Sequence, residues 1–200
     1  MDSVKHLPFN IKRFFGLLFS LILFQYAQAS HAVGMDLSVT WVGPGNLDYE
    51  IKVSFYRDCS GVNAPASLMV CYQSASCGVS ATNYTIFQDA GTGQEISPIC
   101  PTMNTTCTGG SLMGVQEYTY TSALTLPAAC NDWQFSASIY ARNPAITTIT
   151  APGNDAIWIF AALNNLDFPK NSTPSFKNKP VPFICANQPF IYNHGAIDPE

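Results

Sequence analysis

The sequence predicts an all-β protein, an antiparallel Ig-like β-sandwich, on three observations. Apolar and polar residues alternate with a period of two in several short segments, as in strands with one buried and one wet face. Clusters of Gly, Pro, Asn and Asp separate these segments, as tight turns require. Beyond the first thirty residues, no window of a dozen residues has the apolar spacing of three and four that indicates an amphipathic helix, so we expect almost no helix there.

The clearest strand runs from Leu47 to Phe55, where every second residue is apolar. The strand before it, Leu37 to Val42, joins it through Gly43-Pro44-Gly45-Asn46, which favours a hairpin turn. Further strands are expected at residues 67–73, 82–87, 118–126, 133–139 and 157–163. Strands with one apolar face bury those faces against each other in two sheets, and this predicts the sandwich.

The first segment, residues 1–29, is predicted to be a signal peptide. Three basic residues precede an apolar run from Phe14 to Phe24, and the small residues Ala27 and Ala29 suit cleavage after Ala29. The run is about half of the roughly 20 residues that span a bilayer, and no later segment is long and apolar enough. We therefore expect a secreted or cell-surface protein with no transmembrane segment in its mature part.

The mature part is predicted to hold three regions. Residues 30–165 form the β-sandwich, and residues 166–182, rich in Pro and Asn, form a linker with extended segments. Residues 183–200 are expected to begin a second Ig/cadherin-like β domain that the chain does not finish. The chain is therefore interpreted as part of a longer protein, whose other domains are its expected partners.

Charge excludes one class of partner. Three of the nine basic residues and one of the thirteen acidic residues precede residue 30, which leaves six basic against twelve acidic residues in the mature part. A sparsely charged, acid-leaning chain has no basic patch for nucleic acid or an anionic membrane. No nucleic-acid partner is expected.

All seven cysteines lie in the exported part, where an oxidising compartment lets disulfides persist. An odd number leaves at least one thiol without an internal partner. We favour Cys100 with Cys107, because the two bracket a short polar loop. Weaker pairs are Cys71 with Cys77 and Cys59 with Cys130, and the sequence leaves the connectivity open.

Catalytic motifs are not found. The chain has no Gly-x-Ser-x-Gly elbow, no His-Glu-x-x-His and no phosphate-binding Gly-rich loop before a helix. His194 has no neighbouring nucleophile or paired carboxylate, so a packing role is favoured for it. We predict that the chain is not an enzyme and that calcium is the single cofactor it could hold.

Tryptophans raise the possibility of sugar stacking. Trp133 lies in an alternating apolar series and is expected in the core. Trp158 is expected to be exposed, because Ile157 and Ile159 would point to the opposite side. A glycan contact at Trp158, with Tyr140 or Tyr56 beside it, is one hypothesis, although burial in a core or interface is the more common fate of such residues.

Several motifs in a fixed order resemble those of a known group of proteins. They are Tyr56-Arg57-Asp58-Cys59-Ser60-Gly61, Ser76-Cys77-Gly78, Gly91-Thr92-Gly93-Gln94-Glu95-Ile96-Ser97-Pro98, Cys130-Asn131-Asp132-Trp133, Arg142-Asn143-Pro144-Ala145-Ile146-Thr147, Pro182-Phe183-Ile184-Cys185 and Asn193-His194-Gly195-Ala196-Ile197-Asp198-Pro199. The series resembles the amino-terminal region of large secreted Bacteroidetes proteins that end in a gliding-motility-associated carboxy-terminal domain, the sorting signal of type IX secretion. The resemblance implies a cell-surface location and a multidomain architecture.

The resemblance also bears on calcium and on the unpaired cysteine. In proteins of this group the end of the last motif tends to open a calcium-ligating acidic pattern, of which Asp198 and Glu200 would be the start. Carboxylates two residues apart can converge on one cation, but two are too few for a site. The group usually has a cysteine where this chain has Ile191, which implies that Cys185 has lost its partner.

Taken together, these features predict a noncatalytic module of a large extracellular or cell-surface protein, with a role in adhesion, as a spacer or in a matrix, linked to gliding and type IX secretion. Surface glycans or proteins are the expected ligands. The alternatives are a carbohydrate-binding module and an accessory part of an exported hydrolase.

Overall fold

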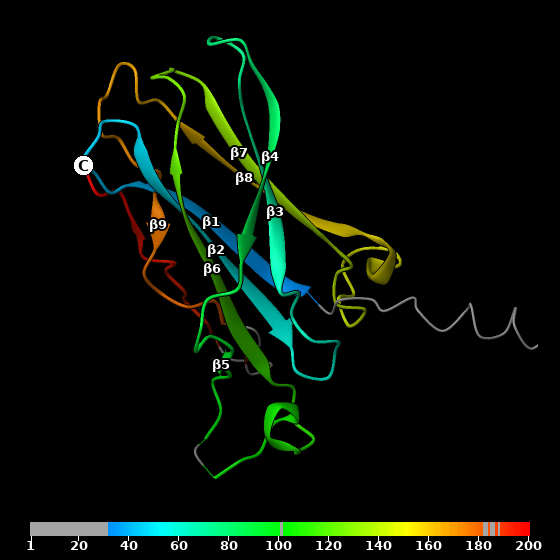
Figure 1. Cartoon of the computed structure of the whole chain (residues 1–200). Helices are drawn as coiled ribbons and strands as arrows, with labels where there is room; N and C mark the ends of the chain where they lie inside the picture. The colour runs from blue at the N-terminus through cyan, green and yellow to red at the C-terminus, as the bar shows by residue number, and fades with distance from the viewer. Residues whose placement is uncertain (1–31, 101, 182–183, 185–186, 188) are drawn as a thin grey trace, which may run out of the picture.

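The computed structural model describes residues 32–100, 102–181, 184, 187 and 189–200 (Figure 1). The predicted signal peptide lies outside the described residues, and so does Cys185. The chain is nearly all-β with antiparallel sheets, which confirms the predicted sandwich class. Among the described residues, no helix is long and apolar enough to cross a membrane. The described helical segments are two short 3-10 turns, η2 (Thr106–Thr108) and η3 (Pro152–Asn154).

Two four-stranded sheets form the sandwich. The first sheet has the order β1-β2-β6-β5, with β1 (Ala32–Trp41), β2 (Asp48–Asp58), β6 (Val115–Thr125) and β5 (Gln94–Glu95). The second has the order β4-β3-β7-β8, with β4 (Val79–Phe87), β3 (Ser67–Ser74), β7 (Trp133–Tyr140) and β8 (Ala156–Leu163). A small third sheet pairs β9 (Ser175–Phe176) with β10 (Ala196–Ile197).

The hairpin predicted between the first two strands is present. Trp41 lies opposite Tyr49, and the register continues to Met35 opposite Phe55. The turn begins at Gly43, whose φ of 63° favours glycine, and the Trp41 indole donates to the Gly45 carbonyl at 2.8 Å. The Gly and Pro residues between the two strands therefore form the tight turn that the sequence predicts.

The core lies between the two sheets and follows the period of two. On β2, Tyr49, Ile51, Val53 and Phe55 are at most 1% exposed, and the polar residues between them face outward. On the second sheet, the largest fully buried side chain is that of Trp133, which confirms its predicted core position. Its ring lies 6.0 Å from that of Tyr72 and 6.3 Å from that of Phe135, measured between centroids.

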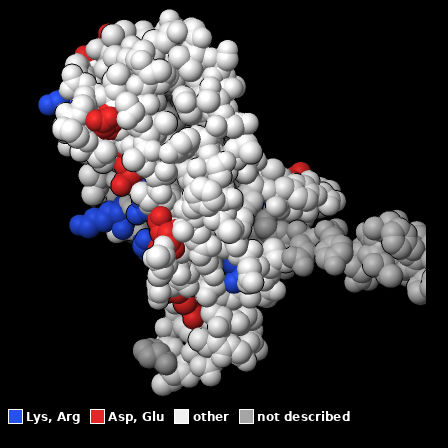
Figure 2. All heavy atoms as spheres, in the orientation of Figure 1, with Lys and Arg blue, Asp and Glu red and all other residues white. Residues whose placement is uncertain are grey.

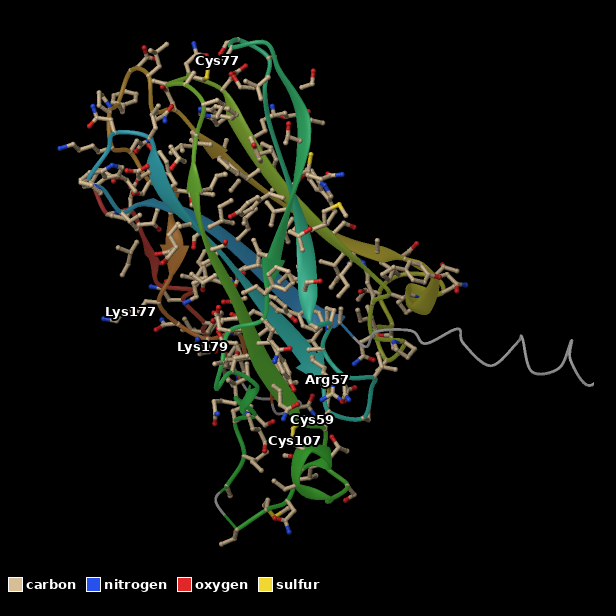
Figure 3. The ribbon with its side chains drawn as sticks, in the orientation of Figure 1. Arg57, Cys59, Cys77, Cys107, Lys177 and Lys179 are labelled. Atoms are coloured by element: carbon tan, nitrogen blue, oxygen red, sulfur yellow. A yellow bond between two sulfur atoms is a disulfide. The ribbon has the colours of Figure 1, made fainter. Side chains whose placement is uncertain are left out.

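Two disulfides lie at opposite ends of the sandwich, and neither is one of the pairs expected from the sequence (Figure 3). Cys59 bonds Cys107 across 48 residues, and Cys77 bonds Cys130 across 53 residues. The expected pairs, which this corrects, are Cys100 with Cys107, Cys71 with Cys77 and Cys59 with Cys130. Cys71 and Cys100 form no disulfide with any described residue.

Strand pairing explains both bonds. Cys59 follows β2, and Cys107 precedes β6, the antiparallel partner of β2, so the two cysteines meet at the same end of the sheet. In the same way Cys77 follows β3, and Cys130 precedes β7, which pairs with β3. The Cα–Cα distances of 5.0 and 6.0 Å fall in the range that disulfides require. Proximity in sequence was the wrong guide, because the sheets bring distant segments together.

The segment predicted as a linker lies against the first sheet. The Thr173 backbone N–H donates to the Val39 carbonyl at 2.9 Å, and the Val39 N–H donates to the Thr173 hydroxyl at 2.8 Å. The Trp41 N–H donates to the Ser172 hydroxyl at 3.1 Å. Further along, β9 falls inside the predicted linker and pairs with β10. A second domain from residue 183 stays a prediction, because several residues at its expected opening lie outside the described ones.

A carboxylate after β4 ties the loop that follows to the first sheet. Asp89 accepts hydrogen bonds from the Thr121 N–H at 3.0 Å and from the Thr121 hydroxyl at 2.8 Å. Burial raises the pKa of Asp89, but hydrogen bonds from Thr119 and Thr121 and the charge of Lys52 lower it, and the result is a pKa below the ordinary 3.8. The folded protein therefore holds Asp89 ionised at a pH where the unfolded chain protonates it.

This difference predicts a loss of stability in acid. The contribution of Asp89 is complete above the unfolded pKa and disappears as the pH falls through the lower folded pKa, because the unfolded state takes up the proton first. We expect the free energy of unfolding, measured by urea titration between about pH 5 and pH 2, to fall more steeply for the wild type than for Asp89→Asn. Equal slopes for the two proteins would contradict the assignment.

Candidate binding surfaces

Charged residues are divided unequally between the two sheets. None of the 33 residues of β3 (8), β4 (9), β7 (8) and β8 (8), all of them described, is Asp, Glu, Lys or Arg. The first sheet carries charges on each of its strands, at Asp36, Asp48, Glu50, Lys52, Arg57, Asp58, Glu95 and Glu117. We call the described residues after Leu163 the tail. Figure 2 shows the result on one side of the molecule, where charged atoms gather over the first sheet and the tail and a wide area remains white. The sandwich thus has one charged and one uncharged sheet.

We call the outward side of the second sheet the neutral face. Its residues project from alternate positions of the four strands: Met69, Cys71, Gln73, Asn83, Thr85, Phe87, Gln134, Ser136, Ser138, Tyr140, Trp158 and Phe160. Most of them carry hydroxyl, amide or aromatic groups. Such a surface lacks the charges that usually keep an exposed sheet hydrated.

Two aromatic rings lie together on β8, one of the two edge strands of this face. Trp158 is 62% exposed and Phe160 is 47% exposed. Ile157, before Trp158, and Ile159, between the two aromatic residues, point inward. The ring centroids are 5.7 Å apart and the planes are within 17° of parallel. The exposure predicted for Trp158 is confirmed.

The neighbouring strand places polar groups beside these rings. On β7, Ser138 lies opposite Trp158 and Ser136 lies opposite Phe160. Tyr140, 58% exposed, lies one outward position further along the same strand. The structure therefore brings Trp158 and Tyr140 together on one face, as the glycan hypothesis requires. It adds Phe160, which lies in the strand expected at residues 157–163 but was not predicted as a contact.

Tyr56, the other proposed glycan contact, is not on this face, and the prediction for it is wrong. It lies on the first sheet and is 4% exposed, and its hydroxyl donates to Asp36 Oδ2 at 2.9 Å. Burial, followed by the negative charge of Asp36, raises the pKa of Tyr56 well above its ordinary 10.0. Tail residues around Pro180 line the same part of the sheet, which explains why the ring is covered.

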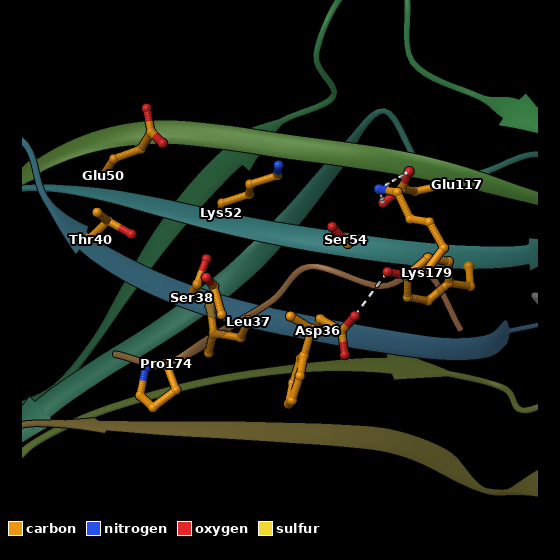
Figure 4. Close-up of a pocket in the computed structure, with 13 residues that line it drawn as sticks. Asp36, Leu37, Ser38, Thr40, Glu50, Lys52, Ser54, Glu117, Pro174 and Lys179 are labelled. Carbon is orange, nitrogen blue, oxygen red and sulfur yellow. Dashed lines mark hydrogen bonds and ion pairs between the residues drawn. The ribbon is translucent and has the colours of Figure 1, made fainter. Parts of the chain in front are cut away.

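A polar pocket of about 250 Å³ lies between the charged sheet and the tail (Figure 4). Its floor is made by outward residues of β1 and β2, among them Asp36, Ser38 and Lys52, and Phe176 and Lys179 of the tail complete it. Lys179 Nζ lies 2.5 Å from Glu117 Oε1, so these two charges neutralise each other. His194, for which packing was expected, contacts the rings of Phe176 and Tyr192 with centroids 5.6 and 4.8 Å away.

Two motifs from the resemblance meet at the end of the sandwich that carries the Cys59–Cys107 disulfide. The Arg57 guanidinium donates to the Gln116 side chain at 2.7 Å, to the Gly61 carbonyl at 2.6 Å and also to the Val62 carbonyl. Asn143 Nδ2, 85 residues further along, donates to Asp58 Oδ2 at 2.8 Å. Arg57, Asp58 and Asn143 are all less than 10% exposed. These polar groups are used to hold turns together, so we assign them to the scaffold.

Calcium at Asp198 and Glu200 stays a prediction. Glu200 Oε2 accepts a hydrogen bond from the Ser172 N–H at 3.1 Å. Within the described part of the chain, no three His, Cys, Asp or Glu side chains gather as metal ligands. A calcium ion takes six to eight oxygens, so these two carboxylates alone do not fit it.

Comparison of the chain with protein-family models, with curated proteins and with solved structures finds no match. The family resemblance therefore rests on the sequence motifs alone.

Proposed function

We propose that this chain is a noncatalytic adhesion module of an exported surface protein, and that it attaches through the neutral face. The observation that carries this proposal is the complete absence of charge from the described strands β3, β4, β7 and β8, together with the exposed Trp158 and Phe160. Depletion of charge with enrichment of aromatic residues is the composition of the centre of a binding interface. Contiguous exposed apolar groups on a monomer indicate an interaction site.

Export is supported by the signal-like first segment of the sequence and by the two disulfides. Disulfides persist in oxidising compartments such as the cell exterior and are rare in the cytosol. The motifs that resemble those of large Bacteroidetes surface proteins add a link to gliding motility and type IX secretion to the proposal. In that setting the module is one domain of a longer chain, and its ligand is a surface glycan or protein.

Attachment of beads tests the proposal. Microspheres coated with residues 30–200, disulfides intact, are expected to resist shear on surfaces coated with polysaccharide or with matrix protein better than albumin-coated microspheres. Gln134→Glu/Ser138→Glu places two carboxylates on exposed positions of the neutral face and is expected to abolish the difference, because a desolvated charge without a partner is unfavourable. Thr147→Glu/Thr148→Glu adds the same charge at exposed positions in the loop after β7 and should leave attachment unchanged.

Two outcomes would contradict the proposal. Wild-type microspheres that adhere no better than albumin-coated ones to every surface would remove the adhesive role. Equal loss of attachment in both double variants would show that overall charge, and not the neutral face, controls attachment.

A further inference from the structure

We infer that the neutral face binds an uncharged polysaccharide, whose sugar rings pack against Trp158 and Phe160 and whose hydroxyls bond to the polar side chains of β7. This inference rests on the proposed function, because it names the ligand of the same face. It is carried by three observations: the absence of charged residues from the strands of the sheet, the arrangement of the two rings and the pattern of polar groups beside them.

Charge selects the class of ligand. Acidic polymers require basic side chains to offset their charge, and none is present on β3, β4, β7 or β8. Ordinary protein surfaces have charged side chains over about a quarter to a third of their positions, and burying those groups against this sheet would leave them without ion partners. A neutral glycan has no such cost. Its many hydroxyls require hydrogen-bonding groups, which the neutral face has.

The rings suit a ligand with flat apolar faces. Trp158 and Phe160 are two positions apart on β8, and their planes are within 17° of parallel. The two rings stack on each other, so they form one exposed aromatic patch that the C–H side of a sugar can contact. Sugar rings have apolar C–H surfaces, and large rigid aromatic side chains provide contact area at a low cost in conformational entropy.

Polar groups run parallel to the aromatic row. Ser138 and Ser136 lie directly opposite Trp158 and Phe160, and Gln134 continues the row on β7. An aromatic row next to a hydroxyl and amide row matches a sugar, which is apolar on its face and polar at its rim. An apolar protein helix would instead require a second apolar row at these positions. The pattern therefore favours a glycan chain lying along β8 over a protein partner.

Titration calorimetry with residues 30–200 tests the ligand class. The neutral probes are laminarin, cellohexaose and α-mannan, and the acidic probes are alginate and hyaluronan. We expect at least one neutral probe to bind and the acidic ones not to bind. Trp158→Ala and Phe160→Ala should each weaken that binding at least about tenfold, as loss of a central aromatic contact does.

Matched variants separate this effect from misfolding. Phe168→Ala removes an aromatic ring that is 63% exposed in the turn after β8, outside the neutral face, and should change the affinity less than about twofold. Ser138→Asp keeps both rings and places a carboxylate beside Trp158, and is expected to weaken binding as strongly as removal of the ring. Far-UV circular dichroism of each variant should match the wild type.

The outcomes distinguish the ligand from the adhesive role. No heat with any neutral probe, with bead attachment that still depends on the neutral face, would overturn the glycan assignment and indicate a protein ligand. Binding of alginate or hyaluronan as tight as that of the neutral probes would also overturn it. If neutral probes give no heat and wild-type beads also fail to attach, the proposed adhesive function itself would be wrong.

Discussion

Trp133→Ala is expected to lower the free energy of unfolding by about 3 to 5 kcal/mol, the usual cost of removing a large aromatic side chain from a core. The Trp133 side chain is fully buried and packs against Tyr72 and Phe135 of the same sheet. Its removal leaves a cavity in the second sheet that these rings can fill only in part. Urea unfolding followed by circular dichroism measures the change, since the slope of the transition reports whether unfolding remains cooperative.

Trp158→Ala is the matched control for this prediction. The substitution is chemically identical and lies in the same sheet, but the Trp158 side chain is 62% exposed. Its effect on stability is expected to stay within about 0.5 kcal/mol, as for most surface positions. Equal destabilisation by the two substitutions would contradict the finding that Trp133 faces the core and Trp158 faces the solvent.

Cys77→Ala/Cys130→Ala should cost about 4 kcal/mol of stability on the loop-entropy account, because the bond closes a loop across 53 residues. Without the bond, the unfolded chain regains the conformational entropy that the disulfide had removed, and unfolding becomes more favourable. Guanidinium unfolding of the double variant and of the wild type, both under non-reducing conditions, provides the comparison.

Cys100→Ser is the control for the disulfide prediction, since Cys100 is exposed and forms no disulfide with a described residue. It should leave stability unchanged. Peptide mapping of the unreduced protein should recover Cys59 linked to Cys107 and Cys77 linked to Cys130. A peptide that links Cys100 to Cys107 would instead support the short loop expected from the sequence.

The strands were predictable because their signal is local. The alternation from Leu47 to Phe55 identifies both the strand and its buried side, and β2 occupies Asp48–Asp58. The same holds for Trp133, whose inward position follows from its place in an alternating series. Each of these conclusions needs only a residue and its neighbours two positions away.

The disulfides and the neutral face depend on sheet order, which the local pattern does not contain. Nothing near Cys59 indicates that the segment before β6 returns beside it. Residues 67–87 and 133–163 contain few charges, which the sequence shows, but only the order β4-β3-β7-β8 places them on one sheet. The sequence therefore identified Trp158 and Tyr140 as candidates without showing that they share a face, and it misplaced Tyr56 on the same basis.

The tail illustrates a further limit of composition. A segment rich in Pro and Asn is typical of a linker, and this composition predicts a linker at residues 166–182. The hydroxyls of Ser172 and Thr173 instead bond to backbone groups of β1. The hydroxyls of small polar side chains can accept hydrogen bonds from backbone N–H groups of any unpaired strand edge within reach.

The bonds from Ser172 and Thr173 bear on how two copies of the protein could associate. β1 is the outermost strand of its sheet, and a bare strand edge is a template on which another copy can add its own strand. The tail occupies backbone groups of Val39 and Trp41 along that edge, so a neighbouring copy finds them already engaged. The tail thus protects this part of the β1 edge against strand addition by another copy.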